Sequence, residues 1–251
     1  MTKLNATRRM ACLLFAAVLA VSFGFPAVPG SAAEYRLIVM KGRKVKWGAP
    51  EEGVGAKVTY AVVDRQRHFD GARNCPTINP LDGLLETSAI APATFAHELE
   101  AAFAAWSSVA NIRFEMASPA EADILIGAET RKRGRAFTNV EYIESAGSTE
   151  RASLTRSVIC LNTEQPWKVG FDGNLEVYDL RYTLTHEIGH AIGLDHPGKL
   201  GELMDFRYHE AFRVPQSGDI AGVVAIYGSS TVKTAARDMA QPGITRVRLS
   251  K

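Results

Sequence analysis

HEIGHAIGLDH, residues 186–196, places three histidines, a glutamate and a glycine at fixed spacings. On a helix, residues four apart lie on the same face, so His186 and His190 can direct ring nitrogens at one ion. Gly193 allows the chain to leave the helix through backbone angles that a residue with a Cβ avoids, so that His196 can turn back as a third ligand. Three nitrogen ligands with an open fourth position are typical of a catalytic zinc site.

Glu187 directly follows the first of these histidines. Its carboxylate can reach a water molecule at the metal without ligating the metal, which is the position of a general base. The alternative is an amphipathic helix whose histidines only satisfy local hydrogen bonds. Five specified positions recur by chance in a chain of this length at a frequency on the order of 10⁻⁴, so the sequence favours the zinc site.

The pattern H-E-x-x-H-x-x-G-x-x-H, followed here by Met204, resembles the signature of the metzincins, which ends in a Met-turn. Within that clan the chain is most similar to the matrixins, the catalytic-domain family of the matrix metalloproteinases. The similarity extends from about residue 57 to 228. It rests on a first strand KVTYAVV (57–63), a helix ending in AWS (105–107), the strand ADILI (122–126) and a last helix at 219–228, arranged in this order around the zinc signature.

The resemblance implies an α/β (α+β) fold of the zincin type, with a twisted mixed sheet, two main helices, a zinc helix that floors the cleft, a Met-turn and a C-terminal helix. It implies a secreted zinc-dependent endopeptidase with one catalytic zinc ion and Glu187 as the general base. Met204 would pack beneath the ligands, since a thioether is a poor zinc ligand beside imidazole. A protein or peptide substrate would bind extended along an exposed sheet edge near residues 136–140.

The sequence departs from the matrixin pattern in two places. Matrixins typically hold a second, structural zinc with histidines upstream of the active-site helix, but no histidine lies between His97 and His186, so we expect no such zinc. The usual matrixin Met-turn reads M-x-P-x-Y, whereas Met204 is followed by Phe206 in place of the proline and then by Tyr208. We expect Tyr208 to shape the wall of the substrate pocket, and Phe206 to alter its form.

Residues 1–33 are interpreted as an export signal, because three basic residues precede an apolar run at 11–25 and small residues precede a cut before Glu34. The run is too short and too quickly broken to indicate a membrane span, although a retained N-terminal anchor is the alternative. We therefore expect an exported protein, secreted or periplasmic, without a stable membrane span after signal removal. Only a short segment separates Glu34 from residue 57, so the resemblance is to bacterial-type matrixins without a hemopexin domain or the usual prodomain.

The charge balance gives no indication of a nucleic-acid partner. The predicted signal removes three of the 29 basic residues and no acidic one, which leaves 29 − 3 = 26 against 27 acidic residues, a formal charge of −1. The basic run RKRGR (131–135) is interpreted as a solvated loop, and its influence on substrate choice stays open. We expect a monomer that acts on proteins or peptides.

Cys12 lies in the predicted signal, so Cys75 and Cys160 are left as an even pair in an exported protein. We predict a disulfide between them, with two buried free thiols as the alternative. A third possibility is that Cys75 blocks the zinc as the thiol of the matrixin propeptide does. The resemblance would then require P-R-C-G-x-P-D ahead of the catalytic domain, which Cys75 does not match.

About 218 residues after the signal suit one domain. We expect an N-terminal arm at 34–56, the catalytic domain at 57–228 and a flexible tail at 229–251. Periodicity predicts a helix at 92–109, and strands at 57–63, 112–116, 124–128, 136–143 and 157–161. Residues 65–90 and 167–178 are expected to be loops. In the second loop, FDGN (171–174) could donate oxygens to calcium, but a plain turn is preferred.

Two other functions stay open at this point. One is a secreted zinc-binding protein that has lost catalysis, although neither the ligands nor the base is damaged in the sequence. The other is a zinc-dependent hydrolase of a non-peptide amide or ester. Peptide cleavage by the purified protein, with and without a chelator, distinguishes these functions from an endopeptidase.

Overall fold

The structure is a computed structural model, and it describes residues 35–131, 134–144, 150–198 and 200–230. The predicted export signal, Cys12 and nearly all of the predicted tail lie outside the described residues. In the part of the chain that is described, no helix combines the length and the apolar character needed to cross a membrane.

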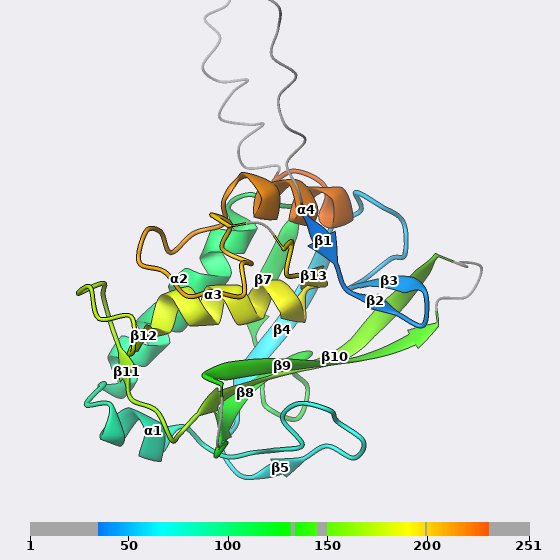
Figure 1. Cartoon of the computed structure of the whole chain (residues 1–251). Coiled ribbons are helices and arrows are strands. Elements are labelled where there is room, and N and C mark those ends of the chain that lie inside the picture. Colours follow the sequence, from blue (N-terminus) through cyan, green and yellow to red (C-terminus); the bar gives the residue numbers. More distant parts are fainter. Residues whose placement is uncertain (1–34, 132–133, 145–149, 199, 231–251) are drawn as a thin grey trace, which may run out of the picture. The chain divides into compact units, whose positions relative to one another are not determined.

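The described residues form four helices and thirteen strands (Figure 1). The helices are α1 (Asp82–Thr87), α2 (Pro92–Ser107), α3 (Leu180–Ala191) and α4 (Ser217–Tyr227). The strands are β1 (Arg36–Leu37), β2 (Val39–Met40), β3 (Arg43–Lys46), β4 (Ala56–Val62), β5 (Arg67–His68), β6 (Thr77–Ile78), β7 (Ile112–Met116), β8 (Ile124–Glu129), β9 (Ala136–Glu144), β10 (Arg151–Asn162), β11 (Trp167–Lys168), β12 (Tyr178–Asp179) and β13 (Leu194–Asp195).

One mixed sheet carries most of the strands, in the order β2-β3-β10-β8-β4-β7, with β9 paired to β10. The neighbours from β3 to β7 run parallel, whereas β9 lies antiparallel to β10 and β2 antiparallel to β3. The central strand β8 is an apolar run whose first five residues are all buried, as expected for a parallel strand covered on both faces. The predicted α+β fold with a mixed sheet is confirmed.

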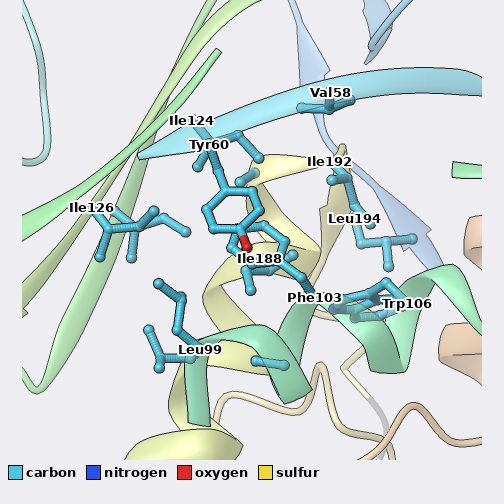
Figure 2. Close-up of a cluster of buried hydrophobic side chains, with 14 of the residues drawn as sticks. Val58, Tyr60, Leu99, Phe103, Trp106, Ile124, Ile126, Ile188, Ile192 and Leu194 are labelled. Atoms are coloured by element: carbon cyan, nitrogen blue, oxygen red, sulfur yellow. The ribbon is translucent and has the colours of Figure 1, made fainter. Parts of the chain in front are cut away.

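Helices α2 and α3 form the layer that packs on this sheet (Figure 2). Pro92 occupies the first turn of α2, and its apolar stripe is buried. The ring of Phe103 stacks on Tyr60 of β4 at a centroid distance of 4.0 Å. The residues labelled in Figure 2 come from the sheet, from α2, from α3 and from the segment after α3, namely Val58, Tyr60, Ile124, Ile126, Leu99, Phe103, Trp106, Ile188, Ile192 and Leu194.

Two polar contacts hold α3 against α2. The indole of Trp106 donates a hydrogen bond to the carbonyl oxygen of Thr185 (2.8 Å). Arg181 donates two hydrogen bonds to the carboxylate of Glu98 (2.6 and 2.8 Å), and Glu98 is only 3% exposed. Because bidentate pairs constrain both distance and orientation, they fix where α3 lies along α2.

Four predicted segments differ from the structure. The predicted loop at 65–90 contains α1, which buries Leu84 and Leu85 but is too short for a helical period to stand out. Strand β10 begins at Arg151 rather than at residue 157, because its first residues pair with β9 and β3. The predicted loop at 167–178 contains the short pair of β11 and β12. Residues of the predicted arm form β1, β2 and β3, of which β2 and β3 extend the main sheet.

Cys75 and Cys160 are joined in the predicted disulfide, with their Cα atoms 5.7 Å apart. The bridge lies in a second apolar cluster that includes Phe69, Ile78 and Val158, and it ties the loop after β5 to the C-terminal part of β10. The bonded sulfur of Cys75 is not a thiol, so the alternative in which Cys75 blocks a metal is wrong.

Removal of this bridge is expected to lower the free energy of unfolding by about 4 kcal/mol, because it closes a loop of 85 residues in the unfolded chain. The measurement is urea unfolding of the wild type and of a variant with Cys75→Ala and Cys160→Ala. Mass mapping of the non-reduced protein provides the control. Equal unfolding free energies of the bridged and unbridged proteins would contradict the prediction.

Candidate active site

The signature residues lie on α3 and on the turn that follows it. The Asp179 side chain caps α3 by accepting a hydrogen bond from the Tyr182 amide (2.8 Å). The helix ends at Ala191, and Gly193 has a φ of +105°, as predicted for the point at which the chain turns back. A Cβ at Gly193 would also lie against the carbonyl oxygen of Val45, so both conformation and space favour glycine there.

The turn brings the three histidine side chains to one point. The Nε2 atom of His196 lies 3.1 Å from Nε2 of His186 and 3.1 Å from Nε2 of His190. In a tetrahedral zinc site with Zn–N bonds of about 2.0–2.1 Å, two ligand nitrogens are about 3.3 Å apart. The spacing of these nitrogens is therefore close to that of zinc ligands.

Two of the histidines hydrogen-bond backbone carbonyl groups through their opposite ring nitrogens, Nδ1. Nδ1 of His186 hydrogen-bonds the carbonyl oxygen of Leu203, and Nδ1 of His190 that of Leu194 (2.8 Å each). A carbonyl oxygen only accepts, so Nδ1 carries a proton, and in the neutral ring Nε2 then presents a lone pair. Burial lowers the pKa of all three histidines, His196 included, which favours neutral rings. The residues present thus fit a zinc ion.

The carboxylate of Glu187, the next residue of α3 after His186, lines the same cleft as the three histidines. It is 6% exposed, and burial raises its pKa to about 7, while a hydrogen bond from Thr138 acts in the opposite direction. The Thr138 hydroxyl lies 2.7 Å from Oε2 of Glu187 and 3.1 Å from the carbonyl oxygen of the same residue. Thr138 belongs to β9 and was not singled out in the sequence, because no local pattern indicates that β9 passes beside α3.

Met204 lies beneath the zinc helix. It is 1% exposed, and a Cβ at Gly189 would collide with its sulfur atom, so the glycine leaves room for the thioether. The Asp219 carboxylate at the start of α4 accepts hydrogen bonds from the Leu203 amide (2.7 Å) and the Met204 amide (3.1 Å). Helix α4 therefore fixes the Met-turn, and with it the carbonyl oxygen of Leu203 that orients His186.

A cleft of about 470 Å³ opens over the histidines. Phe206 lies on its rim, 64% exposed, with its ring centroid 6.5 Å from that of His196. Tyr208 stacks on Tyr178 at 4.2 Å, and its hydroxyl accepts from the Asp179 amide (3.0 Å) and donates to Glu210. The lining residues from β9, α3 and the Met-turn segment include Ala136, Phe137, Thr138, Tyr182, Thr183, Glu187, Asp205, Phe206 and Tyr208.

The two arginines at the ends of the basic run 131–135 have different surroundings. Arg131 pairs with Glu129 (2.7 Å), and its guanidinium lies 4.2 Å from the ring centroid of Phe137. Arg135 lies on the cleft wall, with its guanidinium 4.7 Å from the ring centroid of Tyr178 and a hydrogen bond to Gln165 (2.7 Å). The interpretation as a solvated loop is thus incomplete for Arg135, and the two residues at 132–133 lie outside the described part.

In the segment considered for calcium, residues 171–174, the one carboxylate is that of Asp172, and protein groups contact it. Oδ1 of Asp172 contacts the ammonium of Lys168 and accepts the Asn174 amide (2.9 Å). The carboxylate of Glu210 accepts the amides of Asp172 (3.0 Å) and Gly173 (2.6 Å). An ammonium and backbone amides thus contact these carboxylates.

Comparison with known proteins places this site in a family. The family profile described as matrixin matches residues 84–228. The chain belongs to the matrixin family. The matched part of this matrixin includes α2, the zinc signature, the Met-turn and α4.

Several curated proteins are similar to this matrixin over about half of its length. The interstitial collagenases of Equus caballus and Sus scrofa are 32% and 31% identical to it over 133 and 134 residues. Matrix metalloproteinase-20 of Homo sapiens is 28% identical over 142 residues. In each case the alignment covers 53% of the matrixin described here and 28% of the relative. The likeness therefore concerns one part of these longer proteins.

Proposed function

We propose that this matrixin is a secreted zinc-dependent endopeptidase. The observation that supports it most directly is the convergence of three Nε2 atoms beside the buried carboxylate of Glu187, at the floor of an open cleft. The disulfide between Cys75 and Cys160 supports export, because such bonds persist in oxidising compartments.

His186, His190 and His196 would hold the metal, and the carbonyl oxygens of Leu203 and Leu194 orient two of these rings. Zinc bound there would lower the pKa of a water molecule toward about 7 and polarise the scissile carbonyl. Glu187 accepts the proton of the attacking water and then donates it to the departing amine. Thr138 holds the Glu187 carboxylate toward the cleft by hydrogen-bonding one of its oxygens, Oε2.

The outer edge of β9 is the surface on which a substrate would lie. Among the described strands β9 pairs only with β10, and Ala136, Phe137 and Thr138 line the cleft. An extended peptide can add to such an edge through backbone hydrogen bonds, which do not depend on its sequence. Its scissile bond would then lie near the histidines. Tyr208 and Phe206 would contact the side chains of the peptide from the opposite wall.

The test of this function is cleavage of a diverse peptide library by the purified mature protein, with and without a chelator. We expect internal peptide bonds to be cleaved, with loss of activity on chelation and recovery on addition of zinc. If intact zinc-loaded protein cleaves no peptide, the proposal is wrong. In that case a binding protein or a hydrolase of another amide or ester would be the better description.

We expect one zinc ion per mature chain. Among the described residues, the other group with metal-ligand atoms close together is Cys75, Glu129 and Cys160, and its two cysteines are consumed in the disulfide. Metal analysis of protein purified without added zinc and then dialysed measures this ratio. Retention of two equivalents would contradict it.

Thr138→Val is expected to lower kcat by about tenfold with little change in KM, because the Glu187 carboxylate would lose the hydrogen bond that orients it. Thr138→Ser, which keeps a hydroxyl, is the matched control and should retain most of the activity. Steady-state kinetics on one peptide substrate decides the matter. Equal kcat values for the valine and serine variants would show that the hydroxyl has no positioning role.

A further inference from the structure

The first part of the N-terminal arm, residues 35–47, runs beside the segment that carries the third histidine. Strand β1 pairs antiparallel with β13, with Arg36 opposite Asp195 and Leu37 opposite Leu194. The Ile38 amide continues this ladder by donating to the carbonyl oxygen of Gly193 (2.9 Å). The arm thus borders the whole turn between α3 and His196 (Figure 1).

Both residues of β13 also contact metal-ligand histidines. The carbonyl oxygen of Leu194 hydrogen-bonds Nδ1 of His190 (2.8 Å), and Oδ1 of Asp195 accepts the His196 amide (2.8 Å). A single residue therefore separates the arm from each of these two histidines. A displacement of β13 would change the direction of the His190 ring and the position of His196.

Trp47, in the same arm, also caps the end of the zinc helix. The last carbonyl groups of a helix lack partners within the helix. The indole of Trp47 donates to the carbonyl oxygen of Ala191 (2.8 Å). The Trp47 amide donates to the hydroxyl of Tyr227 (3.1 Å), which in turn donates to the carbonyl oxygen of Ile192 (2.8 Å). Trp47 and Tyr227 are both buried, so these contacts hold the helix end from the side of the arm.

We infer that the arm is a positioning element of the metal site, and that docking of its first strand on β13 strengthens zinc binding. The inference rests on the proposed function, which makes zinc the metal. The backbone ladder carries the effect rather than the ion pair of Arg36 with Asp195 (3.2 Å), because the Arg36 side chain is 69% exposed. Changes to groups that orient metal ligands typically weaken metal binding by about 10–100-fold.

The first experiment compares Ile38→Pro with Ile38→Ala in the full mature protein. Proline removes the N–H that donates to Gly193, whereas alanine removes most of the side chain and keeps the N–H. Zinc affinity is measured by competition with a chromophoric chelator, without reference to activity. We expect the dissociation constant for zinc to rise about 10–100-fold in the proline variant and to stay within about threefold of wild type in the alanine variant.

The second experiment needs no variant. If docking of the arm strengthens zinc binding, zinc must strengthen docking by the same factor. We expect zinc to slow amide hydrogen exchange of Ile38 in the wild type by about 10–100-fold. The reference is the Phe69 amide, which is bonded to Pro76 in the short hairpin of β5 and β6 and should change much less.

The outcomes separate this inference from the proposed function. A wild type that binds zinc and cleaves peptides, together with a proline variant of unchanged zinc affinity, would overturn the inference alone. Equal slowing of exchange at Ile38 and Phe69 would also overturn it, since zinc would then stabilise the fold as a whole. A wild type that binds no zinc would instead contradict the proposed function.

Discussion

Glu187→Gln is expected to lower the rate of peptide hydrolysis by about 10²–10⁴-fold while the protein still folds and binds zinc. The carboxylate lies beside the three ring nitrogens but is not one of the converging ligands. A glutamine has nearly the same size and can still hydrogen-bond Thr138, but its amide cannot accept a proton from water. The loss should therefore be in kcat.

The measurement is steady-state cleavage of one peptide by wild type and variant at equal zinc content, which metal analysis establishes. Glu100→Gln makes the same chemical change at an exposed position of α2 and serves as the control. Wild-type turnover in zinc-loaded Glu187→Gln would show that the general base has been assigned wrongly. Loss of zinc from this variant would instead indicate that Glu187 supports the metal.

His190→Ala is expected to lose both zinc and activity. Its Nε2 is 3.1 Å from that of His196, so its removal leaves two imidazoles to hold the ion. The loss of affinity should exceed the about 10–100-fold that is typical when only an orienting partner is removed. It also leaves the carbonyl oxygen of Leu194 without the histidine that it orients.

Zinc content after dialysis and peptide cleavage at increasing zinc concentrations are the two measurements for this variant. His97→Ala is the matched control, because His97 is exposed on α2. His190→Ala should approach its own maximal activity only at zinc concentrations far above those that the wild type needs. A variant that retains one tightly bound zinc ion would remove His190 from the ligand set.

The candidate site was predictable from the sequence where its residues are close together in the chain. His186, His190 and the turn at Gly193 follow from helical spacing and from one backbone conformation. The strand at 112–116 and the helix beginning at Pro92 were predicted for the same reason, since each has a local pattern.

The parts that could not be predicted depend on pairing between distant segments. Thr138 and Glu187 are 49 residues apart, and only the folded sheet brings them together. The pairing of β1 with β13 joins residues more than 150 positions apart. In the first half of β10 only Ala152 and Leu154 are apolar, and this short alternation did not indicate a strand there. In each case the tertiary contact, rather than the local sequence, determines the structure.

Strand β9 carries both the edge on which we propose that a peptide lies and the Thr138 hydroxyl that hydrogen-bonds Glu187. A rigid shift of β9 would move the bound backbone and the Thr138 anchor in the same direction. The distance between the scissile bond and the Glu187 carboxylate would then vary less than the position of either. Under the proposed function, small motions of β9 would therefore be tolerated, whereas a slip of the peptide by one residue along the edge would present a different bond to Glu187.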